Sequence, residues 1–172
     1  MNQYHRLIER QYLNSKGDSV PLFQTILSVA NQIGLDQALA YLEQCVLEKR
    51  LAWLEARLES LELTGSPVMD GYSLFYETFL GVSAPLHGEI VAQGERRMVT
   101  RWWNPCPTLD ACLKLGLDTR EICRKAYHRP VHEFLRRIHP GLRFDRNYAA
   151  LRPHTPYCEE IIWVERESAS GR

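Results

Sequence analysis

The sequence predicts an α+β protein in which an antiparallel β-sheet of about four strands packs against helices. Apolar residues recur at helical spacing through the first half of the chain, whereas beyond Pro85 they alternate with polar residues as in half-buried strands. The expected elements run as helices, a hairpin, two helices and a second hairpin, without the strand–helix–strand alternation of parallel sheets. A chain of 172 residues, 45% of them hydrophobic, is long enough for one core. We expect one domain over residues 1–166, with a helical part at 1–84 and a sheet-and-helix part at 85–166, followed by a disordered tail at 167–172.

The first half divides into four expected helices, around residues 7–13, from Pro21 to Ile33, from Asp36 to Leu63 and over 72–80. Proline is common in the first turn of a helix, where its missing N–H costs no hydrogen bond, so Pro21 marks the second start. Asp36 is expected to cap the third helix, because its carboxylate can accept free backbone N–H groups. Gly65 and Pro67 lie where that helix should have ended.

Leucine recurs along the expected third helix at the spacing of one buried stripe, formed by Leu47, Leu51, Leu54, Leu58 and Leu61. Four upstream apolar residues are one residue out of phase with it, namely Leu35, Leu39, Leu42 and Val46. Coiled coils need three or four sustained heptads. The short, interrupted stripe therefore favours a domain core, and a homodimer formed through this helix stays open.

The second half contains expected strands at 87–92, 96–103, 142–151 and 157–166, and expected helices at 109–115 and 120–138. Alternation in the second strand places Met98, Thr100 and Trp102 on one face. Thr108 is expected to cap the shorter helix, and the longer one should be bent or interrupted at Pro130.

Composition and missing motifs exclude several classes of protein. No apolar run approaches the roughly 20 residues that span a bilayer, and the N-terminus shows no hydrophobic signal segment, so we expect a cytoplasmic protein without membrane contact. Glycine-rich phosphate loops and the G-x-S-x-G, H-E-x-x-H and C-x-x-C patterns are all absent. Nucleotide-binding, serine-hydrolase and zinc-protease interpretations therefore lose their main support.

Basic and acidic residues balance at 21 each, but residues 120–152 hold nine basic residues against three acidic ones. Nucleic-acid-binding proteins carry such stretches, yet the zero net charge and the lack of a known motif make nucleic acid the least expected partner. Four arginines of this stretch are expected to form a solvated face: Arg136, Arg137, Arg143 and Arg146.

Five cysteines, an odd number, in a chain without a signal segment favour reduced thiols over a disulfide framework. Cys123 lies near the start of an expected helix between Arg120 and Arg124, where the helix dipole and the positive charges favour a thiolate. It is therefore a candidate reactive thiol, with a buried structural thiol as the alternative. Cys45 and Cys112 are expected in the core.

Histidines and aromatic residues supply further candidates for a site. His128 and His132 are four residues apart, but Pro130 between them disturbs the helical geometry that a metal pair needs, which favours a role at a pocket rim. Aromatic residues beside the expected sheet form core or line a ligand cavity. They are Trp102, Trp103, Tyr127, Tyr148, Tyr157 and Trp163.

Five short motifs follow one another in the second half: Asn104-Pro105-Cys106-Pro107, Leu115-Gly116-Leu117, Glu121-Ile122-Cys123, Pro140-Gly141-Leu142-Arg143-Phe144 and Tyr157-Cys158. Together they resemble the C-terminal half of the L-2-amino-thiazoline-4-carboxylic acid hydrolase-like family, and more distantly the vinyl-reductase-type small-molecule-binding domains. The resemblance covers about residues 102–164. Members of the family commonly carry a Gly-Asp turn before the last cysteine, where this chain has residues 152–156.

The resemblance implies hydrolytic opening of a C–N bond in a small cyclic amidine that carries a carboxylate. Such chemistry needs a nucleophile, a proton donor and a cation for the carboxylate. The expected residues are Cys106 or Cys123 as the nucleophile, His128 or His132 for the proton, and Arg152 or Arg129 for the carboxylate. Further substrate contacts are expected from Trp103, Tyr127, Tyr157 and Cys158.

A non-catalytic small-molecule-binding or sensor domain is the alternative function. In that case the aromatic cavity holds the ligand, and the cysteines serve the structure or a metal. The cofactor stays unknown: no metal is assigned, and a divalent ion would have Cys106, Cys123 and Cys158 as its ligands. In either case we expect these three cysteines to converge at one cavity.

Overall fold

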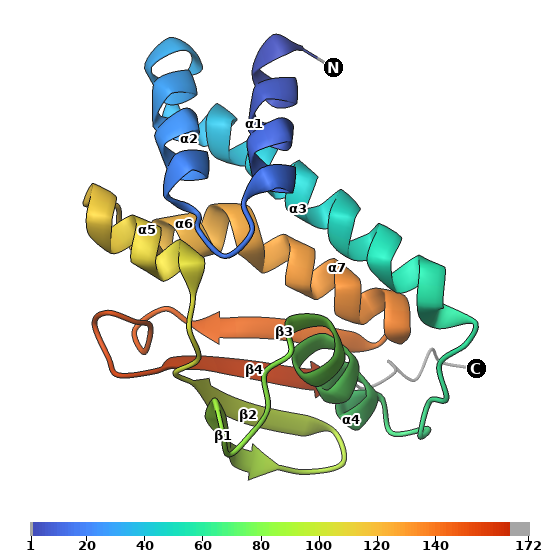
Figure 1. Cartoon of the computed structure of the whole chain (residues 1–172). Coiled ribbons are helices and arrows are strands. Elements are labelled where there is room, and N and C mark those ends of the chain that lie inside the picture. Colours follow the sequence, from blue (N-terminus) through green and yellow to red (C-terminus); the bar gives the residue numbers. More distant parts are fainter. Residues whose placement is uncertain (1, 166–172) are drawn as a thin grey trace, which may run out of the picture.

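Four antiparallel strands form a sheet, and helices cover one face of it (Figure 1). The computed structural model describes residues 2–165, so the tail expected at 167–172 lies outside the described part. The strands are β1 (Gly88–Gln93), β2 (Arg97–Trp102), β3 (Leu142–Asn147) and β4 (Cys158–Val164). The helices are α1 (Gln3–Asn14), α2 (Val20–Ile33), α3 (Leu35–Leu58), α4 (Pro67–Tyr72), α5 (Pro107–Leu115), α6 (Thr119–Ile122) and α7 (His128–Ile138), with π-helices η1 (Ser73–Leu80) and η2 (Cys123–Tyr127). None of these helices is long and apolar enough to cross a membrane. The predicted α+β class, with a helical first half, is confirmed.

The sheet order is β1-β2-β4-β3, and every neighbouring pair is antiparallel. Alternation along β2 turns Met98, Thr100 and Trp102 towards the helices, as predicted, and each is at most 3% exposed. Strand β3 ends at Asn147, earlier than the predicted residue 151. The side-chain oxygen of Asn147 accepts hydrogen bonds from the N–H groups of residues 149 and 150, and these bonds turn the chain away from the sheet.

The buried apolar residues form two separate clusters. One lies between the sheet and α4, η1 and α7, and the other joins α1, α2 and α5 to the first half of α3. In Figure 1, α7 lies between the sheet and α3. Helix α3 contributes residues to both clusters. Its Leu42 and Val46 belong to the second cluster, whereas Leu54 belongs to the first. The phase shift in the leucine pattern therefore marks the point where α3 passes from one cluster to the other.

Helix α3 begins differently from the prediction. Gly34, with φ at 86°, ends α2 and serves as the N-cap of α3 at the same time. Glycine tolerates this positive φ because it has no Cβ. Asp36 consequently lies inside the first turn, where it pairs with Lys125 of η2 instead of capping the helix.

Helix α3 also ends at Leu58, five residues before the predicted Leu63. One carboxylate oxygen of the buried Asp70 accepts both the backbone N–H and the hydroxyl of Thr64, at 2.8 and 2.7 Å. These bonds fix the connecting segment against α4, so the chain leaves the helical path before Thr64.

The predicted helix at 120–138 is divided into α6, η2 and α7. Pro130 lies in the first turn of α7, where its missing N–H costs the helix no hydrogen bond. The expected irregularity therefore does not occur at Pro130 itself. The irregularity lies just before it, in η2, which ends at Tyr127 with φ at −124°.

Candidate functional site

A cavity of about 330 Å³ lies between the helix-covered face of the sheet and the helices, beside the end of β2. This volume is near the lower end of the roughly 300–1,000 Å³ of typical ligand pockets. Residues of α3, η1, β2, α5, η2, α7, β3 and β4 contribute to its lining, so the cavity is assembled from both halves of the chain. Its apolar walls are Phe75, Tyr76, Leu80, Val82, Trp102 and Val131.

Both π-helical segments of the described chain form walls of this cavity. Segment η1 contributes Phe75, Tyr76 and Leu80, and η2 contributes Cys123 and Tyr127. A π turn contains an extra residue, so it rotates the side chains that follow it relative to an α-helix. Such turns are rare and occur frequently at functional sites. Their placement here marks the cavity as a candidate site.

A buried ion pair borders the cavity on the sheet side. Arg146 of β3 and Glu160 of β4 are cross-strand neighbours, and their side chains are 9% and 8% exposed. Nε of Arg146 donates to one carboxylate oxygen at 2.7 Å, and Nη2 forms an ion pair with the same oxygen at 2.6 Å. The Tyr76 hydroxyl donates to the other oxygen at 2.7 Å. Burial alone would lower the pKa of Arg146, but the Glu160 carboxylate raises it above its ordinary value. Arg146 is therefore held in its charged form.

Three buried N–H groups beside the cavity have no acceptor. Across residues 2–165, four buried side-chain nitrogen atoms lack a hydrogen-bond partner, and three belong to cavity-lining residues: Nη1 of Arg50, Nη1 of Arg146 and Nε1 of Trp102. Buried polar groups are nearly always paired, because leaving one unpaired costs about 1–3 kcal/mol. The concentration of unpaired donors at one cavity indicates that it is built to receive a hydrogen-bond acceptor.

Arg50 also brings an uncompensated positive charge to this cavity. It lies on α3 between the two apolar clusters, four residues after Val46 and four before Leu54. In the described part of the chain no carboxylate forms an ion pair with it. Burial lowers the pKa of Arg50, and the Arg146 charge acts in the same direction. Tyr12, Tyr127 and the Glu160 carboxylate act against them, and an arginine stays protonated in proteins. Its guanidinium lies 5.4, 5.8 and 5.9 Å from the ring centres of Phe75, Phe79 and Tyr127.

The two expected nucleophiles, Cys106 and Cys123, both line the cavity. Cys106, rather than the predicted Thr108, is the N-cap of α5, and its Sγ accepts the N–H of Leu109 at 3.5 Å. Cys123 is the first residue of η2, but it continues the helical run that begins at Thr119 of α6. Its own N–H is already bonded to carbonyl groups of α6, so Cys123 lies beyond the free N–H groups of the helix start and the expected dipole effect is lost. Burial raises the pKa of both thiols, that of Cys123 to about 11. Both thiols are therefore protonated at neutral pH.

Arg152, one of the two expected carboxylate ligands, also lines the cavity. Its Nη1 donates to the Asn104 carbonyl oxygen at 2.7 Å, and its Nε donates to the Cys158 Sγ at 3.4 Å. These bonds tie the segment before β4 to the segment after β2. Cys158 contacts Arg152 but is not a lining residue, so two of the three expected cysteines reach the cavity.

Five further predicted residues do not line this cavity: Trp103, His128, Arg129, His132 and Tyr157. Trp103 is 45% exposed, Arg129 pairs with Glu43, and the Arg101 guanidinium lies over the Tyr157 ring. Nδ1 of His128 lies 3.0 Å from the Tyr148 hydroxyl. The helical spacing explains the histidines, because Tyr127 and Val131 face the cavity. His128 and His132 each follow one of these residues, so their side chains are rotated about 100° around the helix axis, away from the cavity.

Three charged cavity residues escape prediction from the sequence: Arg50, Arg146 and Glu160. Each occupies an apolar position in the period of its own element. Arg146 follows the buried Leu142 and Phe144 at a period of two, so its expected place on a solvated face is wrong. Glu160 likewise precedes the buried Ile162. A charged residue in phase with buried apolar ones is the signal that would have found all three.

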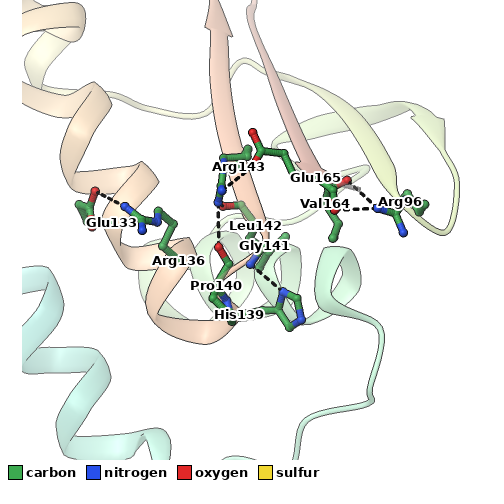
Figure 2. Close-up of polar contacts among 10 residues, drawn as sticks. All are labelled: Arg96, Glu133, Arg136, His139, Pro140, Gly141, Leu142, Arg143, Val164 and Glu165. Carbon is green, nitrogen blue, oxygen red and sulfur yellow. Dashed lines mark hydrogen bonds and ion pairs between the residues drawn. The ribbon is translucent and has the colours of Figure 1, made fainter. Parts of the chain in front are cut away.

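A larger depression, of about 1,160 Å³, lies at the far end of β3 and β4. Figure 2 shows that its arginines are already bonded: Arg96 donates to the carbonyl oxygens of Val164 and Glu165, and Arg143 donates to those of Pro140 and Leu142. These two side chains bond to backbone at the end of β4 and the start of β3. With its donors already bonded, this depression is a weaker candidate for a ligand site.

Metal binding by the cysteines has no support in the geometry. Within residues 2–165, no group of three or more histidine, cysteine, aspartate or glutamate side chains is placed to hold a metal ion. The described geometry therefore adds no support to the predicted ligand set of Cys106, Cys123 and Cys158.

Comparison with known protein families, with curated proteins and with solved structures gives no match. The family resemblance therefore stays a hypothesis that depends on the sequence motifs alone.

Proposed function

We propose that this protein binds a small carboxylate-bearing molecule in the cavity between its sheet and its helices. The observation that carries the proposal is the set of unpaired buried N–H groups of Arg50, Arg146 and Trp102. An ionised carboxylate is an acceptor with two oxygens and about four lone-pair positions, enough for three donors. It also supplies the negative charge that Arg50 lacks, in surroundings where charge-assisted hydrogen bonds are strong.

The protonation of the thiols favours a protein that binds its ligand without a chemical reaction. A thiol nucleophile must ionise, and the Cys123 pKa of about 11 leaves about one thiolate in ten thousand at pH 7. In the described residues, neither Cys106 nor Cys123 forms a hydrogen bond with a histidine that could take its proton.

Hydrolysis of a cyclic amidine is a second candidate, because Cys106 and Cys123 line the same cavity as the unpaired donors. If it is correct, Cys123→Ser lowers turnover by about 10²–10⁴-fold while substrate affinity changes little. Absence of turnover by the wild type, with binding intact, leaves the binding function alone.

The proposed function is tested by thermal unfolding and calorimetry with a set of small carboxylates. A ligand at 100 times its Kd stabilises the folded protein by about 2.7 kcal/mol. Arg50→Gln should abolish this effect, since it removes the uncompensated charge. Arg129→Gln is the matched control, because Arg129 is an exposed arginine outside the cavity. The proposal is wrong if no carboxylate stabilises the wild type, or if Arg50→Gln and Arg129→Gln bind equally well.

A further inference from the structure

We infer that the ligand is a planar aromatic monocarboxylate whose carboxylate bridges Arg50 and Arg146 while its ring lies among the aromatic walls. This inference rests on the proposed function and deepens it, since it names the class of ligand and the end of the cavity that holds each part. It also departs from the cyclic amidine implied by the sequence motifs.

The charged side chains that line the cavity favour a ligand with a single negative charge. Arg146 and Glu160 neutralise each other through one hydrogen bond of 2.7 Å and an ion-pair contact of 2.6 Å. Arg50 is left with one positive charge and a free, buried Nη1. A monocarboxylate compensates this charge, whereas a dianion would bring a second negative charge close to the buried Glu160. Like charges in a buried site repel strongly.

The two guanidinium groups come from different layers of the fold. Arg50 belongs to helix α3 and Arg146 to strand β3, and both residues line the cavity. Both leave Nη1 unpaired, and the indole N–H of Trp102 on β2 adds a third donor. A carboxylate has two oxygens, so it can accept from both arginines at once and from the indole as well.

Aromatic rings form much of the wall beside these donors, together with aliphatic side chains. Phe75, Tyr76, Trp102 and Tyr127 line the cavity, and the Tyr76 and Trp102 rings stack at 4.6 Å. The Arg50 guanidinium already lies near the Phe75 and Tyr127 rings. Aromatic rings gain about 0.5–1.5 kcal/mol from stacked or edge contacts beyond their buried area. The volume of about 330 Å³ limits the ligand to one or two rings.

The test compares three probes of similar size by calorimetry: benzoate, cyclohexanecarboxylate and benzamide. Benzoate and cyclohexanecarboxylate carry the same charge but differ in flatness, and benzamide keeps the flat ring without the charge. We expect benzoate to bind about threefold to tenfold more tightly than cyclohexanecarboxylate, from ring contacts. Benzamide should bind at least about thirtyfold more weakly than benzoate, because it leaves the Arg50 charge uncompensated.

Each outcome separates this inference from the proposed function. Equal or tighter binding of cyclohexanecarboxylate overturns the aromatic class and leaves carboxylate binding intact. Tighter binding of phthalate, a dianion, overturns the single-charge argument. If inorganic phosphate displaces benzoate and binds more tightly, the donors serve a phosphate group and the inference is wrong. Failure of every carboxylate, with Arg50→Gln behaving like wild type, removes the proposed function itself.

Discussion

Removing the charge of Glu160 is the sharpest test of the buried network that borders the cavity. Glu160→Gln preserves the size of the side chain and keeps one carbonyl oxygen as an acceptor for Arg146. The Tyr76 hydroxyl can rotate to accept from the new amide group. The variant therefore removes one negative charge with little change in packing, and it leaves Arg146 charged in a site where its side chain is 9% exposed.

The expected loss of stability follows from this burial. Breaking a buried ion pair by removing one partner costs about 3–5 kcal/mol, and the retained acceptor places this variant at the lower end, about 3 kcal/mol. For a chain of this size, 1 kcal/mol shifts Tm by about 2–4 °C, so thermal unfolding should show a decrease of about 6–12 °C. Because a bound carboxylate would compensate Arg146, saturating benzoate should restore part of the loss.

The neighbouring Glu159→Gln is the matched control. Glu159 faces the other side of the sheet and pairs with Arg101, with side chains 17% and 31% exposed. Partly exposed pairs contribute about 0–1 kcal/mol, so its Tm should fall by no more than about 4 °C. An equal decrease in both variants, or an unchanged Tm for Glu160→Gln, would refute the argument that Arg146 depends on this carboxylate.

Three other predictions concern the core, the thiols and the sheet. Leu54→Asp should unfold or aggregate the protein, because it buries an unpaired charge in α3. Size-exclusion chromatography would show this, and the control Leu63→Asp, at an exposed position, should stay folded. The folded state holds Cys123 protonated up to a pKa of about 11, so its contribution to stability is complete below about pH 9 and is lost as pH rises towards 11. Across that range, ionisation of this thiol should lower the free energy of unfolding, measured with denaturant, by at most about 1.4 kcal/mol per pH unit. If the free energy of unfolding changes with pH as steeply in Cys123→Ala as in the wild type, the assignment is contradicted. Gly88→Ala would place its Cβ against the backbone carbonyl oxygen of Arg101 and should lower the unfolding free energy by about 1–3 kcal/mol. Gly94→Ala, with 3.7 Å to the nearest atom, should change it little, and equal effects in the two variants would show that the approach at Gly88 is not tight.

Much of the fold could be predicted because local patterns determine it. The alternation of Met98, Thr100 and Trp102 predicted the buried face of β2. The helical spacing of apolar residues predicted the helices of the first half. The ends of helices depended on side-chain contacts outside the helix or on shared turns. Asp70 fixes the segment after α3 from six residues away, and Gly34 serves two helices at once.

The candidate site was less predictable, for a physical reason. Cysteines and histidines draw attention by their chemistry, and Cys106 and Cys123 do line the cavity. The charged groups that define it are ordinary residue types, and their importance comes from burial. The pairing of Arg146 with Glu160 depends on the β3–β4 register, and the position of Arg50 depends on how α3 crosses two clusters. Neither is fixed by local sequence.

The indole N–H of Trp102 gives the most direct test of the claim that a carboxylate occupies the cavity. The chain has four tryptophans, so a ¹⁵N–¹H spectrum should contain four indole signals, and Trp102→Phe identifies the one of interest. Titration with benzoate should move the Trp102 signal downfield, as its unpaired N–H gains a charged acceptor, while the signal of the exposed Trp103 stays in place. A Trp102 signal that does not move while calorimetry records binding would contradict the account.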